Sequence, residues 1–201
     1  RDDSWAAGTA RVIAGSGDRQ CPEAVTHGCR LLRLQEKSWI LMKVEASKYY
    51  KSKAPGNFSL FRFIIASTVN PEARLIALIR AQKFLYGYKI LRPLSKITSA
   101  LITTLNSCCI SPNATIGIGV RFPHPIGIVV GDGAILENDV TIYQNVTIGT
   151  KSGGYPLLRQ GVIVYPMSVV IGAISIGENS IVGACSFVDK DVPANSIFKK
   201  Y

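Results

Sequence analysis

The chain contains two histidines, His27 and His124, and only the second has neighbours that suggest acid–base chemistry. His124 stands between Pro123 and Pro125, which restrict the backbone on both sides, and the glycine-containing run 127–131 follows it. An imidazole that is neutral near pH 7 can accept a proton from a hydroxyl group, which makes His124 a candidate general base. A lone histidine is more often structural than catalytic, so the elements around it must be considered next.

A six-residue repeat surrounds His124. Every sixth residue from Ile110 to Val188 is apolar, with Ser152 as the single exception. This period fits neither a strand nor a helix, and it is typical of a parallel β-helix, in which short strands stack and the repeated residues form one core. We therefore predict a mainly β fold, with a β-helix preceded by a small α-helical region. An ordinary sheet protein is disfavoured because its strands do not hold one phase over such a length.

The segment 151–156 interrupts the repeat with the residues Lys-Ser-Gly-Gly-Tyr-Pro. Its glycines and proline predict a loop that replaces about one repeat without shifting the register. Loops that leave a regular solenoid tend to lie on its functional face. We therefore expect this loop to lie beside the turn that carries His124.

The formal net charge of +10 is unevenly distributed. Residues 110–201 contain six basic and six acidic residues, so the whole excess lies in residues 1–109. Such an uneven charge distribution is informative about the binding partners of a protein and not about its fold. It is most pronounced in residues 42–107, which we predict to be a region of basic amphipathic helices.

Three domains are predicted: residues 1–41 as a poorly ordered extension or one added for expression, residues 42–107 as the helical region, and residues 108–201 as the β-helix. Helices are expected over 39–52, over 59–67, from Asn70-Pro71 to Gly87, and from Pro93 onward. We expect the helical region to cover the open end of the β-helix, as a solenoid requires. Contact with an anionic surface at the inner face of a membrane is a second prediction for the same helices.

Several classes of protein are disfavoured. No stretch is long and apolar enough for a transmembrane helix, and no signal peptide is recognisable. The five cysteines are odd in number and scattered, which favours a reducing compartment and a cytoplasmic location. A zinc-dependent β-helix enzyme needs three histidine ligands, and only His124 lies in the repeat, so no metal is expected. No nucleic-acid-binding motif is present, so no nucleic-acid partner is expected.

Residues 108–193 resemble the hexapeptide-repeat acyltransferases, and most closely the serine acetyltransferase group. The matching pieces are His124 with the run 127–131, then residues 137–140, Gln144, 146–147, 151–154 and 189–193. The resemblance implies a left-handed β-helix and a homotrimer that binds acetyl-CoA in clefts between its subunits. It implies that His124 deprotonates an acceptor hydroxyl, which attacks the thioester while a backbone N–H stabilises the oxyanion. It also assigns cofactor contacts to Gly149, Thr150, Ala184 and Lys190, with Gly149 as the oxyanion glycine.

The sequence departs from the serine-specific pattern at three places. An aspartate is replaced by Pro123, a second by Cys109, and the loop lacks an Arg-His pair and reads Gly154-Tyr155-Pro156. Recognition of a free amino acid requires charged partners for its carboxylate and ammonium groups. The Pro-His-Pro form and the shortened loop look more like relatives that acetylate sugars. This resemblance implies a sugar O-acetyltransferase of capsule, lipopolysaccharide or exopolysaccharide biosynthesis, acting on a free, nucleotide-linked or lipid-linked sugar. The alternatives are a serine O-acetyltransferase of cysteine biosynthesis and a non-catalytic β-helix scaffold.

Overall fold

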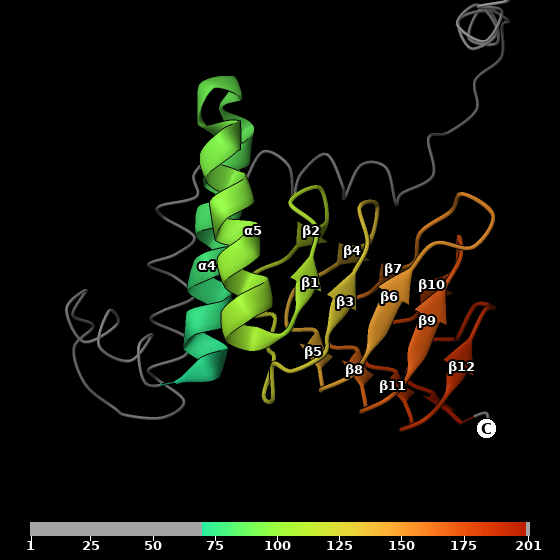
Figure 1. The fold of residues 1–201 in the computed structure, drawn as a ribbon. Helices are drawn as coiled ribbons and strands as arrows, with labels where there is room; N and C mark the ends of the chain where they lie inside the picture. The colour runs from blue at the N-terminus through green and yellow to red at the C-terminus, as the bar shows by residue number, and fades with distance from the viewer. Residues whose placement is uncertain (1–69, 200–201) are drawn as a thin grey trace, which may run out of the picture.

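The computed structural model of the protein describes residues 70–199, in which two α-helices lie side by side against one end of a β-solenoid (Figure 1). The helices are α4 (Pro71–Gly87) and α5 (Arg92–Asn106), joined by the 3-10 turn η1 (Lys89–Leu91). The two helices expected over 39–52 and 59–67, and the extension 1–41, lie outside the described residues.

The start of α4 follows the predicted signals. The Asn70 side chain accepts a hydrogen bond from the Glu72 backbone N–H at 3.0 Å, Pro71 occupies the first helical position, and the helix ends at Gly87. The next helix, α5, begins at Arg92, one residue before the predicted start. The predicted start and end of α4 are therefore confirmed, and the predicted start of α5 is correct to within one residue.

The strands form three parallel sheets, and each of the three middle coils contributes one strand to each sheet. The first coil has an isolated bridge at Arg121 in place of a third-sheet strand, and the last has one at Val192 in place of a second-sheet strand. The first sheet contains β1 (Cys109–Ile110), β3 (Val129–Val130), β6 (Thr147–Gly149), β9 (Val169–Ile171) and β12 (Phe187–Val188). The second contains β2 (Thr115–Ile116), β4 (Ile135–Leu136), β7 (Leu157–Leu158) and β10 (Ser175–Ile176). The third contains β5 (Thr141–Ile142), β8 (Ile163–Val164), β11 (Ile181–Val182) and β13 (Ile197–Phe198). The predicted parallel β-helix is confirmed.

Aliphatic side chains from equivalent strand positions stack along the inside of the solenoid. In the first sheet the stacked residues are Ile110, Val130, Ile148, Val170 and Val188, all at most 5% exposed. The other two sheets repeat the arrangement with Ile116, Leu136, Leu158 and Ile176, and with Ile142, Val164 and Val182. A single coil could not bury these side chains, so the stack itself is the core.

The predicted unbroken six-residue phase is wrong in the middle of the chain. Register partners on a regular coil are eighteen residues apart, such as Val129 and Thr147. Twenty separate Cys109 from Val129, and twenty-two separate Thr147 from Val169. Two extra residues therefore enter the turn 123–127, and four enter the segment 151–156, which shifts the register instead of preserving it.

The two insertions hide each other in the sequence because their lengths add to one repeat. Between the two insertions, the every-sixth series falls on buried turn residues, each two positions before a stacked aliphatic residue in the sequence. These turn residues are Ile128, Ala134, Val140 and Val146. Since both kinds of position are apolar, the every-sixth pattern continues through the shifted part. The first insertion contains His124, so the irregularity marks the predicted base.

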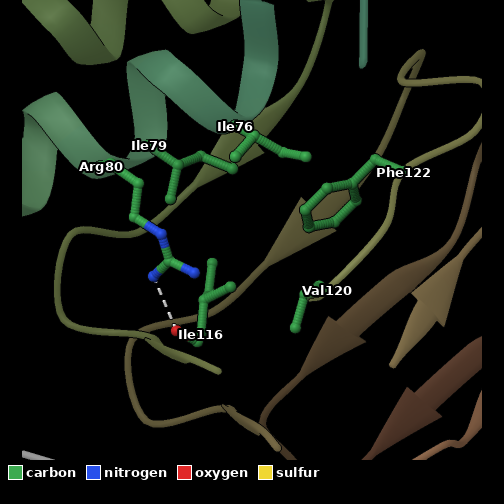
Figure 2. A pocket seen from close by; sticks show the side chains of 6 residues that line it. All are labelled: Ile76, Ile79, Arg80, Ile116, Val120 and Phe122. Atoms are coloured by element: carbon green, nitrogen blue, oxygen red, sulfur yellow. Dashed lines mark hydrogen bonds between the residues drawn. The ribbon is translucent and has the colours of Figure 1, made fainter. Parts of the chain in front are cut away.

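Side chains of α4 cap the first coil. Backbone N–H groups of the first coil donate to carbonyl groups of the second, as from Thr115 to Ala134, while several carbonyls of the first coil accept hydrogen bonds from side chains of α4. Arg80 donates to the Ile116 carbonyl at 2.8 Å (Figure 2) and to the Gly117 carbonyl at 2.6 Å. These carbonyls are buried and need donors, so the contacts fix the helix on the solenoid.

Two further side chains and an apolar contact complete this cap. Gln82 donates to the Ile110 carbonyl at 3.2 Å, and Lys83 donates to the Ala114 carbonyl. Beside Arg80, apolar side chains of α4 and the first coil line a small pocket: Ile76, Ile79, Ile116, Val120 and Phe122 (Figure 2). Polar and apolar contacts therefore act together where α4 covers the end of the solenoid.

The buried amine of Lys83 predicts a pH dependence of stability. Burial, with a smaller contribution from the charge of Arg80, lowers the pKa of Lys83 from 10.5 to about 8. Between these values the unfolded chain binds more protons than the folded chain, so the free energy of unfolding should rise with pH in this range. We expect a higher urea midpoint at about pH 9.5 than at about pH 7.

The control for this prediction is Lys83→Met, which should reduce the gain by removing one titrating amine and leaving the other groups in place. An identical pH dependence in the two proteins would contradict the assignment. The comparison uses the difference between the two proteins, because tyrosines and cysteines titrate in the same range.

The apolar side of α5 faces outward. Its exposed side chains include Leu94, Ile97, Leu101 and Leu105, and the exposed cations Arg92 and Lys96 lie on the same helix. None of the helices in the described part of the chain is long and apolar enough to cross a bilayer. Contact of the basic helices with a membrane surface stays a prediction.

Candidate active site

His124 projects from a two-residue bulge at the corner between the third and first sheets. Pro125 is buried under the bulge while His124 is exposed. The bulge is closed by a hydrogen bond from the Ile126 N–H to the His124 carbonyl at 2.8 Å. Gly127 has a φ of +67°, and a Cβ there would lie 2.1 Å from Oδ1 of Asn145, so this position requires glycine. The local sequence therefore buries the proline and presents the imidazole.

Two tyrosines continue from His124 along the axis of the solenoid. The His124 and Tyr143 ring centroids lie 6.3 Å apart, and the Tyr143 and Tyr165 rings are stacked at 5.2 Å with an interplanar angle of 4°. Each tyrosine directly follows a third-sheet strand and remains partly exposed. The sequence analysis did not identify either one, although both follow a stacked aliphatic residue, Ile142 or Val164.

The imidazole has room for a substrate. Within residues 70–199, no hydrogen bond reaches the ring of His124, and Cys109, which replaces the aspartate of the serine-specific pattern, is an exposed residue of β1. Next to Tyr143, Gln144 has a buried Oε1 with no hydrogen-bond donor in this part of the chain. A buried amide oxygen is costly to leave unpaired, so Gln144 is suited to accept a hydrogen bond from a ligand.

The predicted cofactor residues fall into two groups. Ala184 is exposed in the turn that leads into β12, at the same corner as His124. Gly149 ends β6, Thr150 follows it, and Lys190 comes two residues after β12, so these three lie at the opposite, carboxyl ends of the first-sheet strands. Within one chain, the structure does not bring the two groups into one site.

Gly149 has no packing reason to be glycine. A Cβ at this position would meet only Ile171 and Thr147 side-chain atoms at 3.7 Å and 4.0 Å, which is ordinary contact. Glycine at such a position lets a ligand approach the backbone closely. This observation fits the role that the resemblance assigns to Gly149, although it does not test that role.

The loop of segment 151–156 is held at the same edge as Gly149. The Lys151 ammonium lies 3.0 Å from Oδ2 of Asp189. The Tyr155 ring covers Gly131 and Gly133, where an added Cβ would lie 2.6 Å and 2.5 Å from the ring. The expectation that the loop lies beside His124 is therefore wrong for a single chain, because the width of the first sheet separates them.

No group of three histidine, cysteine, aspartate or glutamate side chains that could hold a metal ion occurs in residues 70–199. The three cysteines of this part, Cys108, Cys109 and Cys185, are free thiols. Burial raises the pKa of the Cys108 thiol, which keeps it protonated and unreactive near neutral pH. The chemistry available at the His124 corner is therefore that of the imidazole and its polar and aromatic neighbours.

The β-helix is similar to serine acetyltransferases. The chain is 38% identical over 105 residues to the serine acetyltransferase of Buchnera aphidicola subsp. Schizaphis graminum, covering 50% of this chain and 40% of the relative. It is 43% identical over 91 residues to that of Escherichia coli strain K12, covering 43% and 33%. A solved serine acetyltransferase in complex with CoA shares the fold, with a TM-score of 0.67, 24% identity, and coverage of 84% of this chain and 69% of that one. No family model matches the chain.

These similarities correct the predicted acceptor. The chain spans less than half the length of the two curated relatives, and both are serine acetyltransferases, so the prediction of a sugar O-acetyltransferase is wrong and its alternative is favoured. The prediction relied on missing charges at Pro123, Cys109 and the loop. Partners for a carboxylate or an ammonium group can come from another element or from backbone groups, so their absence at chosen positions does not exclude an amino acid.

Proposed function

We propose that this chain carries the β-helix of an acetyl-CoA-dependent serine O-acetyltransferase. The observation that supports it most strongly is the 38–43% identity to serine acetyltransferases over 91 to 105 residues. The exposed His124, in a bulge that interrupts the register of the solenoid, supplies the base that such a reaction needs.

In the proposed reaction, His124 accepts the proton of the serine hydroxyl. The serine oxygen then attacks the carbonyl carbon of the acetyl thioester, and a C–O bond forms. As the tetrahedral intermediate collapses, the C–S bond breaks, and the imidazolium returns its proton to the leaving thiolate. The products are O-acetylserine and CoA. A backbone N–H near the thioester oxygen would stabilise the negative charge that develops there.

The proposed oxyanion donor, the N–H of Gly149, requires a second subunit. Gly149 and Thr150 lie at the edge of the first sheet opposite His124. A homotrimer would bring the His124 edge of one chain to the Gly149 edge of the next, as the resemblance implies. Light scattering that reports a monomer at micromolar concentration would argue against this arrangement.

The acceptor specificity of the proposed enzyme can be tested directly. Purified protein, acetyl-CoA and L-serine should release free CoA, measured with a thiol reagent, at a rate well above that of acetyl-CoA with buffer. L-threonine and a panel of free and nucleotide-linked sugars serve as acceptor controls. Failure to acetylate serine, or equal rates with serine and with a sugar, would contradict the proposed function.

A further inference from the structure

The helix α5 turns its polar side toward α4. Two of the three residues that it buries are polar; the three are Ser95, Ile102 and Asn106. The Asn106 side chain donates to the Pro71 carbonyl at 3.3 Å and accepts a hydrogen bond from Arg74 at 3.4 Å. Gln82 of α4 donates to the Ser99 hydroxyl at 2.7 Å. Hydrogen bonds therefore hold α5 on α4, and the apolar side of α5 faces away from this contact.

The outward side of α5 carries a continuous row of aliphatic side chains, which we call the apolar stripe. Three or four positions separate its members, so they lie on one side of the helix. They are Leu94, Ile97, Leu101 and Leu105, which are between 40% and 58% exposed. Ile90, in the turn before α5, adds an aliphatic side chain that is 91% exposed. Exposed aliphatic residues that gather in this way mark a surface that binds a partner.

The surroundings of the apolar stripe are cationic. Lys89, Arg92 and Lys96 are exposed near its amino-terminal end, and none of them forms an ion pair in residues 70–199. The guanidinium of Arg92 lies over the Tyr86 ring at 5.1 Å and keeps its charge there. Residues 73–131 contain seven lysine and arginine residues and no aspartate or glutamate. A partner that matches this surface offers an apolar region and negative charge together.

Other parts of the protein do not provide that negative charge. A second copy of α5 brings no carboxylate to the three cations, since residues 73–131 contain none. Residues 42–69, which precede α4 in the chain, contain five basic residues and one acidic residue, Glu45. An anionic lipid bilayer matches both properties, because its headgroups attract lysine and arginine and its acyl chains accept aliphatic side chains.

We propose that α5 binds the surface of an anionic membrane, with the apolar stripe inserted below the headgroups and the three cations bound to lipid phosphates or carboxylates. From Leu94 to Leu105 the helix rises about 16 Å, which is well short of the roughly 30 Å hydrocarbon core of a bilayer. The helix therefore lies in the plane of the interface while its polar side stays on α4. This inference goes beyond the proposed function and does not depend on it.

Sedimentation with lipid vesicles tests the proposal on the whole chain. The protein should bind vesicles of phosphatidylcholine with roughly 30% phosphatidylserine at least about tenfold more tightly than vesicles of pure phosphatidylcholine. Raising the NaCl concentration from about 50 mM to about 500 mM should weaken binding to the anionic vesicles, because salt screens the attraction between the charges. Equal binding to the two kinds of vesicle, or binding to neither, would overturn the proposal.

Ile97→Glu tests the apolar stripe, and Ile197→Glu is its matched control. The two isoleucines are 58% and 66% exposed, and Ile197 lies on β13, at the opposite end of the solenoid. Ile97→Glu should weaken binding to the anionic vesicles about tenfold or more, because a carboxylate does not enter the apolar part of the interface. Ile197→Glu changes the net charge equally and should alter binding by less than about twofold. Similar losses for the two variants would overturn the insertion of α5.

Lys96→Ala and Lys199→Ala form a second matched pair, since both remove one exposed lysine. A lysine at an anionic surface contributes about fivefold to binding, so Lys96→Ala should weaken binding to the anionic vesicles by about this factor. Lys199 follows β13, far from α5 along the solenoid, and its removal should have an effect of less than about twofold. Equal effects of the two substitutions would place the membrane contact elsewhere and overturn the proposal.

A protein partner for the apolar stripe would give a different set of results. If residues 42–69 or a second copy covered the stripe, Ile97→Glu would lower the melting temperature or change the molar mass, and vesicle binding would stay the same. That outcome would overturn the proposal. We expect the melting temperature of Ile97→Glu to stay within about 3 °C of the parent protein, with an unchanged mass by light scattering. Acetylation of serine enters none of these measurements, so the proposed function can fail or hold independently.

Discussion

Replacing His124 with alanine is expected to lower turnover with serine by roughly 10²–10⁴-fold, the usual contribution of a positioned general base. A serine hydroxyl is a weak nucleophile near neutral pH, so its attack on a thioester needs a base within hydrogen-bond reach. The fold should survive, because His124 is exposed and Pro125 carries the buried contact of the bulge. The measurements are kcat, melting temperature and CoA affinity on the same preparation.

The other histidine provides the control for this substitution. His27→Ala should retain the activity of the parent protein, which would show that loss of activity is specific to position 124. If His124 had only a structural role, the melting temperature would fall and activity would fall only in proportion to the folded fraction. A stable His124→Ala protein with most of its activity would instead show that His124 is not the general base.

Replacing Arg80 with leucine is expected to lower the free energy of unfolding by roughly 2–5 kcal/mol. The guanidinium donates to two backbone carbonyls, of Ile116 and Gly117, and each buried carbonyl left without a donor costs about 1–3 kcal/mol. Arg80 is 4% exposed, so water does not readily replace these bonds. Urea denaturation of the parent and the variant measures the difference.

Arg74→Leu is the matched control on the same helix. Its guanidinium donates to the Leu105 carbonyl at 3.2 Å and to Oδ1 of Asn106 at 3.4 Å, in more exposed surroundings. We expect a loss of less than about 1 kcal/mol there. Arg80→Lys should give an intermediate loss, since an ammonium group lacks the rigid fork that reaches two carbonyls. Equal losses for Arg74→Leu and Arg80→Leu would show that the capping contacts are not responsible.

Local patterns predicted the fold and singled out one candidate residue of the site. A repeat of apolar residues follows directly from the stacking of coils, so the β-helix could be predicted. The Asn70-Pro71 pair is a local helix-start signal, so the start of α4 could be predicted as well. His124 was identified because it is the single histidine in the repeat. In each case the signal lies within a few residues or in one period.

Features that depend on distant contacts could not be predicted in this way. The bonds from Arg80 to Ile116 and Gly117 join residues more than 30 positions apart, and nothing near Arg80 indicates its partners. The tyrosine pair was overlooked because Tyr143 and Tyr165 are separated by a coil of twenty-two residues, which a search with a fixed period does not align. The acceptor was mispredicted because charged residues were sought only at the positions where the serine-specific pattern has them, and other positions can supply the same contacts.

The capped first coil also determines how far the solenoid can extend. A bare first coil would leave backbone N–H and carbonyl groups unpaired along its open side, and these could pair with backbone groups at the last coil of another molecule. Two such ends are complementary, and repeated head-to-tail joining would produce an open filament. Arg80, Gln82 and Lys83 donate to carbonyls of the first coil, so α4 blocks this end of the solenoid against head-to-tail assembly.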